Sequence, residues 1–252
     1  MKNPLLQPGK SNTKTAKNEM PTWSLSLAQA NLSGHEVCPH RTKGCTEVCV
    51  GKAGMAGVFP TILQSRIRKT QLFFNNRAGF LSQLVKELSN ANKWCEKHGK
   101  TGLVRLNTFS DIAWEKMLDL TAYPNLRFYD YTKNIKRAFE ALEPGQEHRR
   151  VCYSLNEKSD MKKVRELIDR GGTVAVVFGD VLYNPSHNKI GPLPDTYMGV
   201  PVVDGDATDD RFNDPRGVFV GLRLKGTIMR RRAACDTGFA RNAFTPLTVG
   251  GK

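Results

Sequence analysis

The sequence contains no long apolar stretch and no hydrophobic segment behind its first residues. A transmembrane helix needs about 20 consecutive apolar residues, and no part of the chain approaches that length. The chain starts Met-Lys-Asn-Pro, and the polar residues that follow lack the apolar region of a secretory signal. These absences argue against a membrane-spanning protein and against a secreted protein. We therefore expect a cytoplasmic protein that does not bind a membrane.

Two common ligand-binding motifs are incomplete in this chain. The run Pro8-Gly9-Lys10-Ser11 ends like a phosphate-binding loop, but the first glycine of that motif is missing and no strand signal precedes it. The acidic run from Asp204 to Asp214 does not have the ligand spacing of an EF-hand calcium loop. The sequence therefore indicates neither a Walker-type nucleotide site nor an EF-hand.

Acidic residues are scarce relative to basic ones. The chain has 38 Lys and Arg residues against 24 Asp and Glu residues, which gives a formal net charge of +14. Such an excess favours contact with polyanions, nucleic acid above all. The charge is spread along the chain without a standard nucleic-acid motif, so solvated helix faces explain it equally well. Nucleic acid or a nucleotide is a candidate partner, and the oligomeric state is left open.

Six cysteines are too few for a disulfide scaffold in 252 residues. Three of them, Cys38, Cys45 and Cys49, lie in one short run, Cys-Pro-His-Arg-Thr-Lys-Gly-Cys-Thr-Glu-Val-Cys. In a reducing compartment, clustered cysteines are typical of metal ligands. We therefore expect these three residues to bind a metal cofactor.

The spacing of the three cysteines favours an iron–sulfur cluster, of the 4Fe-4S type, because three thiolates can hold three corners of a cubane. Zinc sites usually use cysteine pairs two to four residues apart. Zinc remains the alternative, with His35 and His40 completing the site, and unligated packing cysteines are the third interpretation. Cys152 or Cys235 can supply a fourth cluster ligand; without one, an open iron remains for a small ligand or redox chemistry. Cys95 lies on the apolar face of a predicted helix and is expected in the core.

The hydrophobic pattern after residue 20 predicts alternating strands and helices. Strands are predicted at 23–27, 103–106, 126–131, 150–155, 173–178, 201–203 and 217–222, with helices at 81–95, 135–142 and 161–168 among the segments between them. Such alternation implies βαβ units and a parallel sheet. We expect a disordered basic arm over 1–20 and one α/β domain over 21–252. Its expected form is a single-domain (βα)n barrel or partial barrel, TIM-like; an open doubly wound sheet is the alternative.

Polar side chains follow several predicted strands, where ligand sites of parallel α/β folds lie. Candidate catalytic residues are Asn107, Ser110, Asp111, Lys133, Asp204 and Asp206. Lys133 follows the aromatic run 128–131 and can hold a nucleotide phosphate, while core tyrosines beside a surface lysine are the simpler explanation. For Asp204 and Asp206 the alternatives are a cation or acid–base site and a turn with Asp–Arg pairing.

Several segments together resemble an uncharacterised bacteriophage family, gene product eighty-eight, over about residues 22–240. The resemblance is carried by Cys38, Cys45 and Cys49 with the segments 66–74, 104–111, 128–133, 203–206 and 211–215. It implies a phage protein made in the cytoplasm of a bacterial host, and it implies no particular activity.

A weaker similarity is to radical SAM enzymes, which also place three cysteines after the first strand of an α/β barrel. It implies a cluster at the barrel mouth and, if the protein is an enzyme, an iron–sulfur-dependent one of radical SAM or lyase type. This chain departs from that pattern in its cysteine spacing and in having no evident glycine-rich SAM motif.

Overall fold

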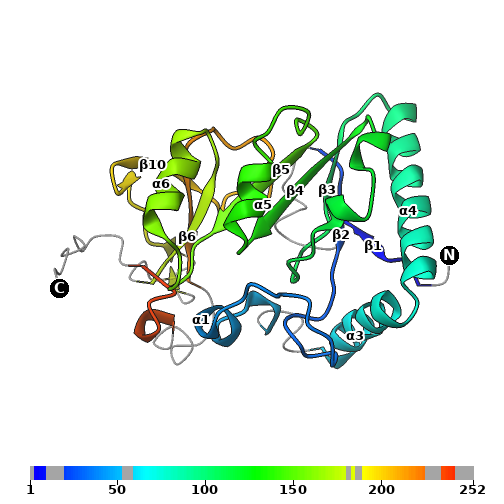
Figure 1. The fold of residues 1–252 in the computed structure, drawn as a ribbon, viewed down its shortest axis with the longest axis horizontal. Helices are drawn as coiled ribbons and strands as arrows, with labels where there is room; N and C mark the ends of the chain where they lie inside the picture. Colours follow the sequence, from blue (N-terminus) through cyan, green and yellow to red (C-terminus); the bar gives the residue numbers. More distant parts are fainter. Residues whose placement is uncertain are drawn as a thin grey trace.

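The computed structural model describes residues 3–9, 20–52, 59–179, 183–184, 189–224 and 234–241, and its centre is a nine-stranded sheet (Figure 1). The strand order in this sheet is β1-β2-β3-β4-β5-β6-β11-β10-β9. The strands are β1 (Leu6–Pro8), β2 (Thr22–Leu25), β3 (Gly102–Arg105), β4 (Leu126–Thr132), β5 (Arg149–Ser154), β6 (Val174–Phe178), β9 (Thr196–Tyr197), β10 (Val200–Asp204) and β11 (Phe219–Arg223). A separate two-stranded ribbon pairs β7 (Tyr183–Asn184) with β8 (Lys189–Ile190).

The sheet is mostly parallel but open. Strands β2 to β6 lie side by side in chain order and are parallel, as the alternating pattern predicts. The edge strands β1 and β9 each pair antiparallel with one neighbour and do not meet each other. The predicted α/β class with a parallel sheet is confirmed, whereas the TIM-like form of the predicted barrel or partial barrel is not, because the sheet is not closed. A barrel needs a helix after each strand, and between β6 and β11 the described residues form only short strands.

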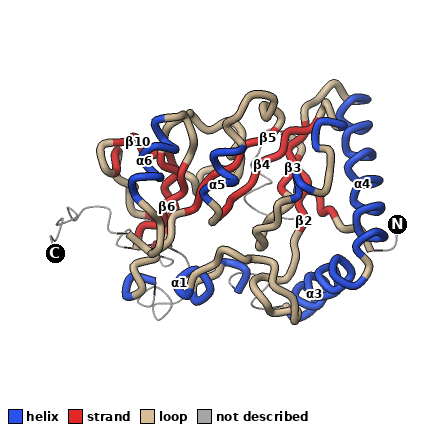
Figure 2. The backbone as a smooth tube through the Cα atoms, in the orientation of Figure 1, coloured by secondary structure: helices blue, strands red, loops and turns tan. Residues whose placement is uncertain are grey.

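Five α-helices lie between the strands among the described residues (Figure 2), and the predicted helices at 81–95, 135–142 and 161–168 correspond to three of them. The five are α1 (Lys43–Glu47), α3 (Pro60–Asn75), α4 (Arg77–Lys97), α5 (Ile135–Glu140) and α6 (Met161–Asp169). Local capping sets several starts: the side chains of Asn76, Asn134 and Asp160 accept backbone N–H groups at the first turns of α4, α5 and α6. The helical segments of the chain are thus encoded locally.

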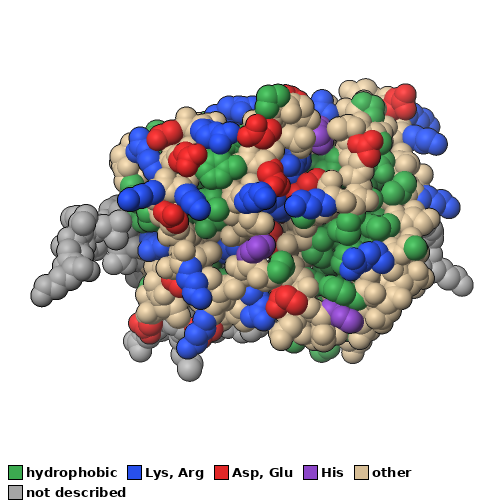
Figure 3. Space-filling view, viewed as in Figure 1, with side chains coloured by type: hydrophobic (Ala, Val, Ile, Leu, Met, Phe, Trp, Pro, Cys, Tyr) green, Lys and Arg blue, Asp and Glu red, His purple; other side chains and the backbone are tan. Residues whose placement is uncertain are grey.

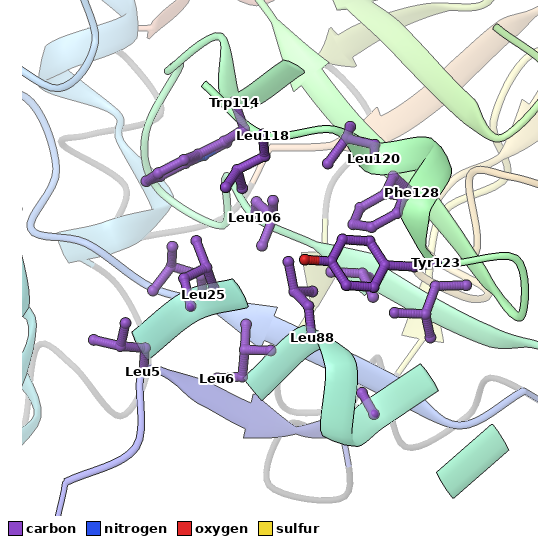
Figure 4. Packing of buried hydrophobic residues seen from close by; sticks show 14 of the residues in the cluster. Leu5, Leu6, Leu25, Leu88, Leu106, Trp114, Leu118, Leu120, Tyr123 and Phe128 are labelled. Carbon is purple, nitrogen blue, oxygen red and sulfur yellow. The ribbon is translucent and has the colours of Figure 1, made fainter. Parts of the chain in front are cut away.

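The largest apolar core lies between α3, α4 and the first strands of the sheet (Figure 4). Leu88 of α4 and Leu25 at the end of β2 are fully buried in it, and Trp114 is 1% exposed. Cys95 also belongs to this cluster, as the helical pattern predicts. A second core packs α5 and α6 against β5, β6 and β11. The two cores fix the strands whose carboxyl ends carry the candidate site.

Part of the predicted disordered arm belongs to the sheet. Strand β1 pairs antiparallel with β2, with Leu6 opposite Leu25. Leu5 is 1% exposed, and the backbone N–H groups of Leu5 and Leu6 donate to the Glu87 carboxylate at 3.0 and 2.7 Å. The arm prediction is corrected for this short segment, where burial of two leucines and hydrogen bonding to α4 provide order. Most of the remaining arm lies outside the described residues.

Residues 205–214 lie against the sheet face opposite α5. Asp130 of β4 faces α5, where Arg137 Nη2 donates to its carboxylate at 2.7 Å. Its neighbour Tyr129 points to the other face, because side chains alternate along a strand. There Tyr129 donates to Asp209 at 3.0 Å, and Arg105 Nη1 contacts both Asp209 carboxylate oxygens at 3.0 and 2.8 Å. A buried ion pair thus anchors this segment to the sheet.

Candidate functional site

The loop with the three cysteines runs along the carboxyl edge of the sheet, from the end of β2 to α1 below β6 (Figure 1). Cys38 is held there by the loop after β3: its thiol donates to the Phe109 carbonyl at 3.4 Å, and the Asp111 N–H donates to the Val37 carbonyl at 2.8 Å. The cysteines therefore lie at the edge predicted from the strand pattern, after the first parallel strand.

Cys45 lies on the short helix α1, whose start is fixed by two side chains. The Thr42 hydroxyl accepts the Cys45 N–H at 3.2 Å and donates to Glu157 Oε2 at 2.8 Å. Glu157 Oε1 also accepts the Gly44 N–H at 2.9 Å. Glu157 follows β5, so it ties the middle of the cysteine loop to a neighbouring strand.

The three thiols are electrostatic neighbours. Burial raises the pKa of Cys38 to about 12, and the Cys49 and Cys45 thiols and the Asp111 carboxylate add to this shift. Cys38 is partly buried, and a neutral thiol is therefore favoured there in the absence of a bound cation. Binding of a cation or a metal cluster would reverse this preference by stabilising the thiolates.

Two cationic side chains flank the thiols. The Arg66 guanidinium of α3 lies 3.9 Å from the centre of the Phe109 ring and donates to the Gly51 carbonyl at 3.2 Å. Burial lowers the pKa of Arg66, and the nearby Cys49 thiol opposes that shift. Burial likewise lowers the pKa of Lys133, and Cys45 opposes it. Both cations therefore lie close enough to stabilise negative charge on the cysteines.

The Lys133 ammonium is held by the loop after β5. It donates to the Ser154 carbonyl at 3.1 Å, to the Ser154 hydroxyl at 2.8 Å and to the Leu155 carbonyl at 2.9 Å, and it lies 4.7 Å from the Phe239 ring centre. These bonds match the three donors of a lysine ammonium. The arrangement suits a fixed positive charge better than a mobile phosphate-binding group.

The predicted candidates Asn107, Ser110 and Asp111 shape the loop after β3. Asn107 Oδ1 accepts from the Ser110 hydroxyl at 2.7 Å, and it also accepts the N–H of Ile112 and the indole N–H of Trp114, both at 3.0 Å. Asn107 thus closes the loop on itself. A role for these residues in chemistry stays a prediction, and their observed contacts are structural.

Asp111 connects three elements at the sheet edge. Its carboxylate accepts from the Thr132 hydroxyl at 2.7 Å and from the Lys133 N–H at 2.8 Å, and Arg137 Nη1 lies 3.4 Å away. The backbone N–H of Asp111 donates to the carbonyl of Val37, the residue before Cys38. The position of Cys38 relative to β4 therefore depends on this carboxylate.

A charged network beneath Asp111 has no counterpart in the sequence predictions. Arg137 of α5 contacts Glu115 through Nε at 2.8 Å and Asp130 through Nη2 at 2.7 Å, while Arg149 Nη1 lies 3.1 Å from Glu115. All these groups are largely buried. Burial raises the pKa of Asp130 to about 6, although Arg137 opposes the shift. The sequence does not predict these ion pairs, because the paired residues lie on helices and strands that are separate in the chain.

Asp204 and Asp206 form a separate polar turn at the end of β10. Arg223 of β11 pairs with Asp204 through Nη1 at 2.8 Å, and its backbone N–H donates to Asp206 at 2.9 Å. The Asp206 N–H donates to Asp204 at 2.8 Å. This is the turn with Asp–Arg pairing, one of the two alternatives that the sequence allows. Its place in the sheet order is near the end opposite β2.

The candidate additional ligands lie in different settings. Cys152 is buried on β5 with Ala175 and Val220, and burial raises its pKa to about 12. Cys235 is exposed on a helical turn after residue 233. The His35 ring stacks on Phe74, with ring centres 4.4 Å apart. Within the described ranges, no three His, Cys, Asp or Glu side chains form a group suited to a single metal ion.

Positive charge on the visible molecular face is interspersed with acidic groups and is not gathered into one stripe (Figure 3). No described helix is long and apolar enough to span a bilayer. On this face, the described residues therefore show no continuous basic stripe to which the +14 charge can be assigned.

Comparison with known proteins identifies a family for this chain. No curated protein and no solved structure matches the chain, and the similarity to radical SAM enzymes receives no support. The model of one family, described as Gene product 88, matches residues 4–242 and supports a bacteriophage origin. This span covers nearly the whole chain, including the cysteine loop, both cores and the Asp204 turn. The chain therefore belongs to the Gene product 88 family.

Proposed function

We propose that this phage protein binds an iron–sulfur cluster, of the 4Fe-4S type, through Cys38, Cys45 and Cys49. The observation that supports the proposal is that one short loop along the carboxyl edge of the sheet carries all three cysteines, with Cys38 held by the loop after β3 and Cys45 on α1. Thiolate ligands on one short loop are the usual way in which proteins hold such clusters.

The charges around the thiols support the same proposal. A cluster with three thiolate ligands is anionic, and nearby cations stabilise it and tune its potential. Arg66 lies beside Cys49 and Lys133 beside Cys45. The Asp111 N–H donates to the Val37 carbonyl and the Glu157 carboxylate accepts the Gly44 N–H, so these two residues hold the loop at both sides of Cys38 and Cys45.

The spacing of the three cysteines favours a cluster over zinc, because zinc sites usually use cysteine pairs two to four residues apart. The stacked ring of His35 also makes it a poor fourth ligand for zinc.

A cluster with three cysteine ligands leaves one iron for a small ligand or for redox chemistry, unless Cys152 or Cys235 completes the set. Cys152 shares an electrostatic neighbour, Lys133, with Cys45. Cys235 adjoins Ala234, which packs in one apolar cluster with Cys45. The residues Asn107, Ser110 and Asp111 border this edge and remain candidates for contact with such a ligand.

Protein produced and purified without oxygen provides the test. We expect a brown protein with about four irons and four sulfides per chain. Replacing Cys38, Cys45 or Cys49 individually by Ala should remove most of both. The matched control is Cys95→Ala, which deletes a thiol from the helix core and should leave the iron and sulfide content per folded chain unchanged. Colourless protein that carries stoichiometric zinc alone would rule out the cluster.

The net charge of +14 favours a second candidate function, binding of nucleic acid with the metal centre in a structural role. This reading predicts binding of single-stranded DNA or RNA that weakens steeply as salt is raised. Absence of retention on an oligonucleotide column at low salt would argue against it. Either function is compatible with a protein that works in the cytoplasm of the bacterial host.

A further inference from the structure

A polar cavity of about 200 Å³ lies next to the cysteine loop, between α3 and the strands β1 and β2. It is lined by Gln7, Ser26, Thr61, Ile62, Ser65, Arg66 and Lys69. The α3 residues come from the first three turns of one helix face, at the spacing that places side chains side by side. Apart from Ile62, every lining side chain offers a hydrogen-bond donor, and none is acidic.

Two cations reach this cavity, and neither forms an ion pair with a carboxylate among the described residues. Lys69 is 3% exposed, and its ammonium donates to the Leu5 carbonyl at 2.7 Å. The nearest acid, Glu87, accepts the backbone N–H groups of Leu5 and Leu6 and forms no ion pair with Lys69. Glu87 supplies an electrostatic counter-charge to Lys69, and the Leu5 carbonyl takes one of the three donors of the ammonium, so the other donors can bind an anion in the cavity.

Arg66 is the second cation. Its guanidinium is fixed by the Phe109 ring and by the Gly51 carbonyl, a neutral partner. Its flat fork of donors suits an oxyanion. Arg66 lines the cavity and is also an electrostatic neighbour of the Cys49 thiol.

The start of α3 adds a third source of positive potential. This 16-residue helix begins at Pro60, has no acidic residue in its first turn and receives no side-chain cap. Pro60 has no N–H and the Ile62 N–H donates to the Phe59 carbonyl at 3.1 Å, so this helix start contributes its partial positive charge, which favours an anion. Thr61 and Ile62, in this first turn, line the cavity.

We propose that this cavity binds a terminal phosphate group, supplied by a small phosphomonoester or by the phosphorylated end of an oligonucleotide. Hydroxyls, a guanidinium, an ammonium and a helix start surround the space on several sides, which suits a tetrahedral anion with many acceptor oxygens. The volume accommodates a phosphate and a few further atoms, whereas drug-sized ligands occupy cavities of about 300 Å³ or more.

This inference does not depend on the cluster, although Arg66 would place the bound phosphate beside it. The two proposals are therefore tested by separate measurements. Phosphate binding is followed by titration calorimetry of the protein purified without oxygen, and the cluster is followed by iron and sulfide content. Absence of phosphate binding would not affect the cluster proposal, and absence of iron and sulfide would not affect the phosphate proposal.

Inorganic phosphate and glycerol 3-phosphate are the probes, with glycerol and acetate as controls. We expect one saturable site per chain for both phosphates, with a dissociation constant in the millimolar range or below, and no comparable binding of the controls. Adding a 5′-phosphorylated and a 5′-hydroxyl oligonucleotide distinguishes the two sources. A preference for the phosphorylated strand larger than that for glycerol 3-phosphate assigns the site to nucleic-acid ends; the reverse assigns it to small phosphomonoesters.

Matched variants locate the site. Ser65→Asp introduces a carboxylate into the cavity, whereas Gln64→Asp adds the same charge on the exposed side of α3. Arg66→Gln and Arg68→Gln form a second pair, with Arg68 exposed. The cavity variants should weaken phosphate binding at least about tenfold, and the controls should change it by less than about twofold. Absence of saturable binding, or equal loss in both members of a pair, would overturn the proposal.

Discussion

Glu157, in the loop after β5, accepts the backbone N–H of Gly44 at 2.9 Å and so joins the cysteine loop to the opposite half of the sheet edge. Its second oxygen accepts from the Thr42 hydroxyl at 2.8 Å. Two bonds from one carboxylate therefore position the helix that carries Cys45. This residue is the clearest non-cysteine determinant of the site.

Replacement of Glu157 by Ala tests that relationship. The variant loses two charge-assisted hydrogen bonds, which lowers the free energy of unfolding by about 1–3 kcal/mol. We expect faster loss of iron and sulfide under air, because the Cys45 segment is no longer held. Glu143→Ala is the control, since Glu143 forms an exposed pair with Arg170 and should cost less than about 1 kcal/mol. Equal cluster lifetimes in the two variants would contradict this role.

Asp209 is predicted to matter for stability and not for the metal centre. Asp209→Ala leaves the Arg105 guanidinium buried without its partner and deprives Tyr129 of its acceptor. Loss of one member of a buried pair costs about 3–5 kcal/mol. Denaturant unfolding should show this loss, while iron and sulfide per folded chain stay unchanged. The exposed pair of Asp169 with Arg165 provides the control Asp169→Ala, for which a change near zero is expected.

Alkaline pH should destabilise the metal-free protein through Cys38. The pKa of this thiol is about 12 in the folded protein and near 9 when it is unfolded, so the folded state retains a proton that the unfolded state releases. The free energy of unfolding therefore falls as pH rises from about 9 towards 12. Urea unfolding of wild type and Cys38→Ser measures this, and the variant should lose less stability over that range. Identical slopes for both proteins would show that Cys38 is not buried as described.

Phosphate binding should depend on the protonation of Lys69. Burial lowers the pKa of Lys69 to about 8; Glu87 of α4 opposes the shift, and Arg68 and Arg66 of α3 add to it. The ammonium is present below that pH, so affinity should fall as pH rises through about 8. Lys69→Met should bind more weakly at neutral pH and show a flatter profile. A wild-type affinity that is constant between pH 7 and 9 would exclude Lys69 from the site.

Local signals in the sequence predict most of the sheet. The apolar run 173–178 and the alternating run 23–27 correspond to β6 and β2, and the helical pattern around Leu84 and Leu88 corresponds to α4. The sequence does not predict strand β1, because three residues in a basic segment are too few to show the alternation of apolar and polar residues that marks a strand. This strand is held in place by hydrogen bonds to the carboxylate of Glu87, which is 81 residues away from Leu6.

The polar parts of the candidate site are harder to predict. Ser110 is a candidate catalytic residue by its place after a predicted strand, yet its hydroxyl donates to the Asn107 side chain. Asn107 accepts three bonds at once, which no local pattern encodes. Arg66, Lys69 and Glu157 owe their importance to neighbours far along the chain. Of the candidate site residues, only the three cysteines are recognisable from the sequence, because cysteine is rare and clustered cysteines are typical of metal ligands.

The most direct test of the cluster proposal is the measurement of iron and acid-labile sulfide in protein purified without oxygen, alongside the Cys38→Ala, Cys45→Ala and Cys49→Ala variants. The account predicts about four of each per wild-type chain and nearly complete loss in each variant, with Cys95→Ala unaffected. Wild-type protein that lacks iron and sulfide after anaerobic reconstitution, or variants that retain both, would contradict it.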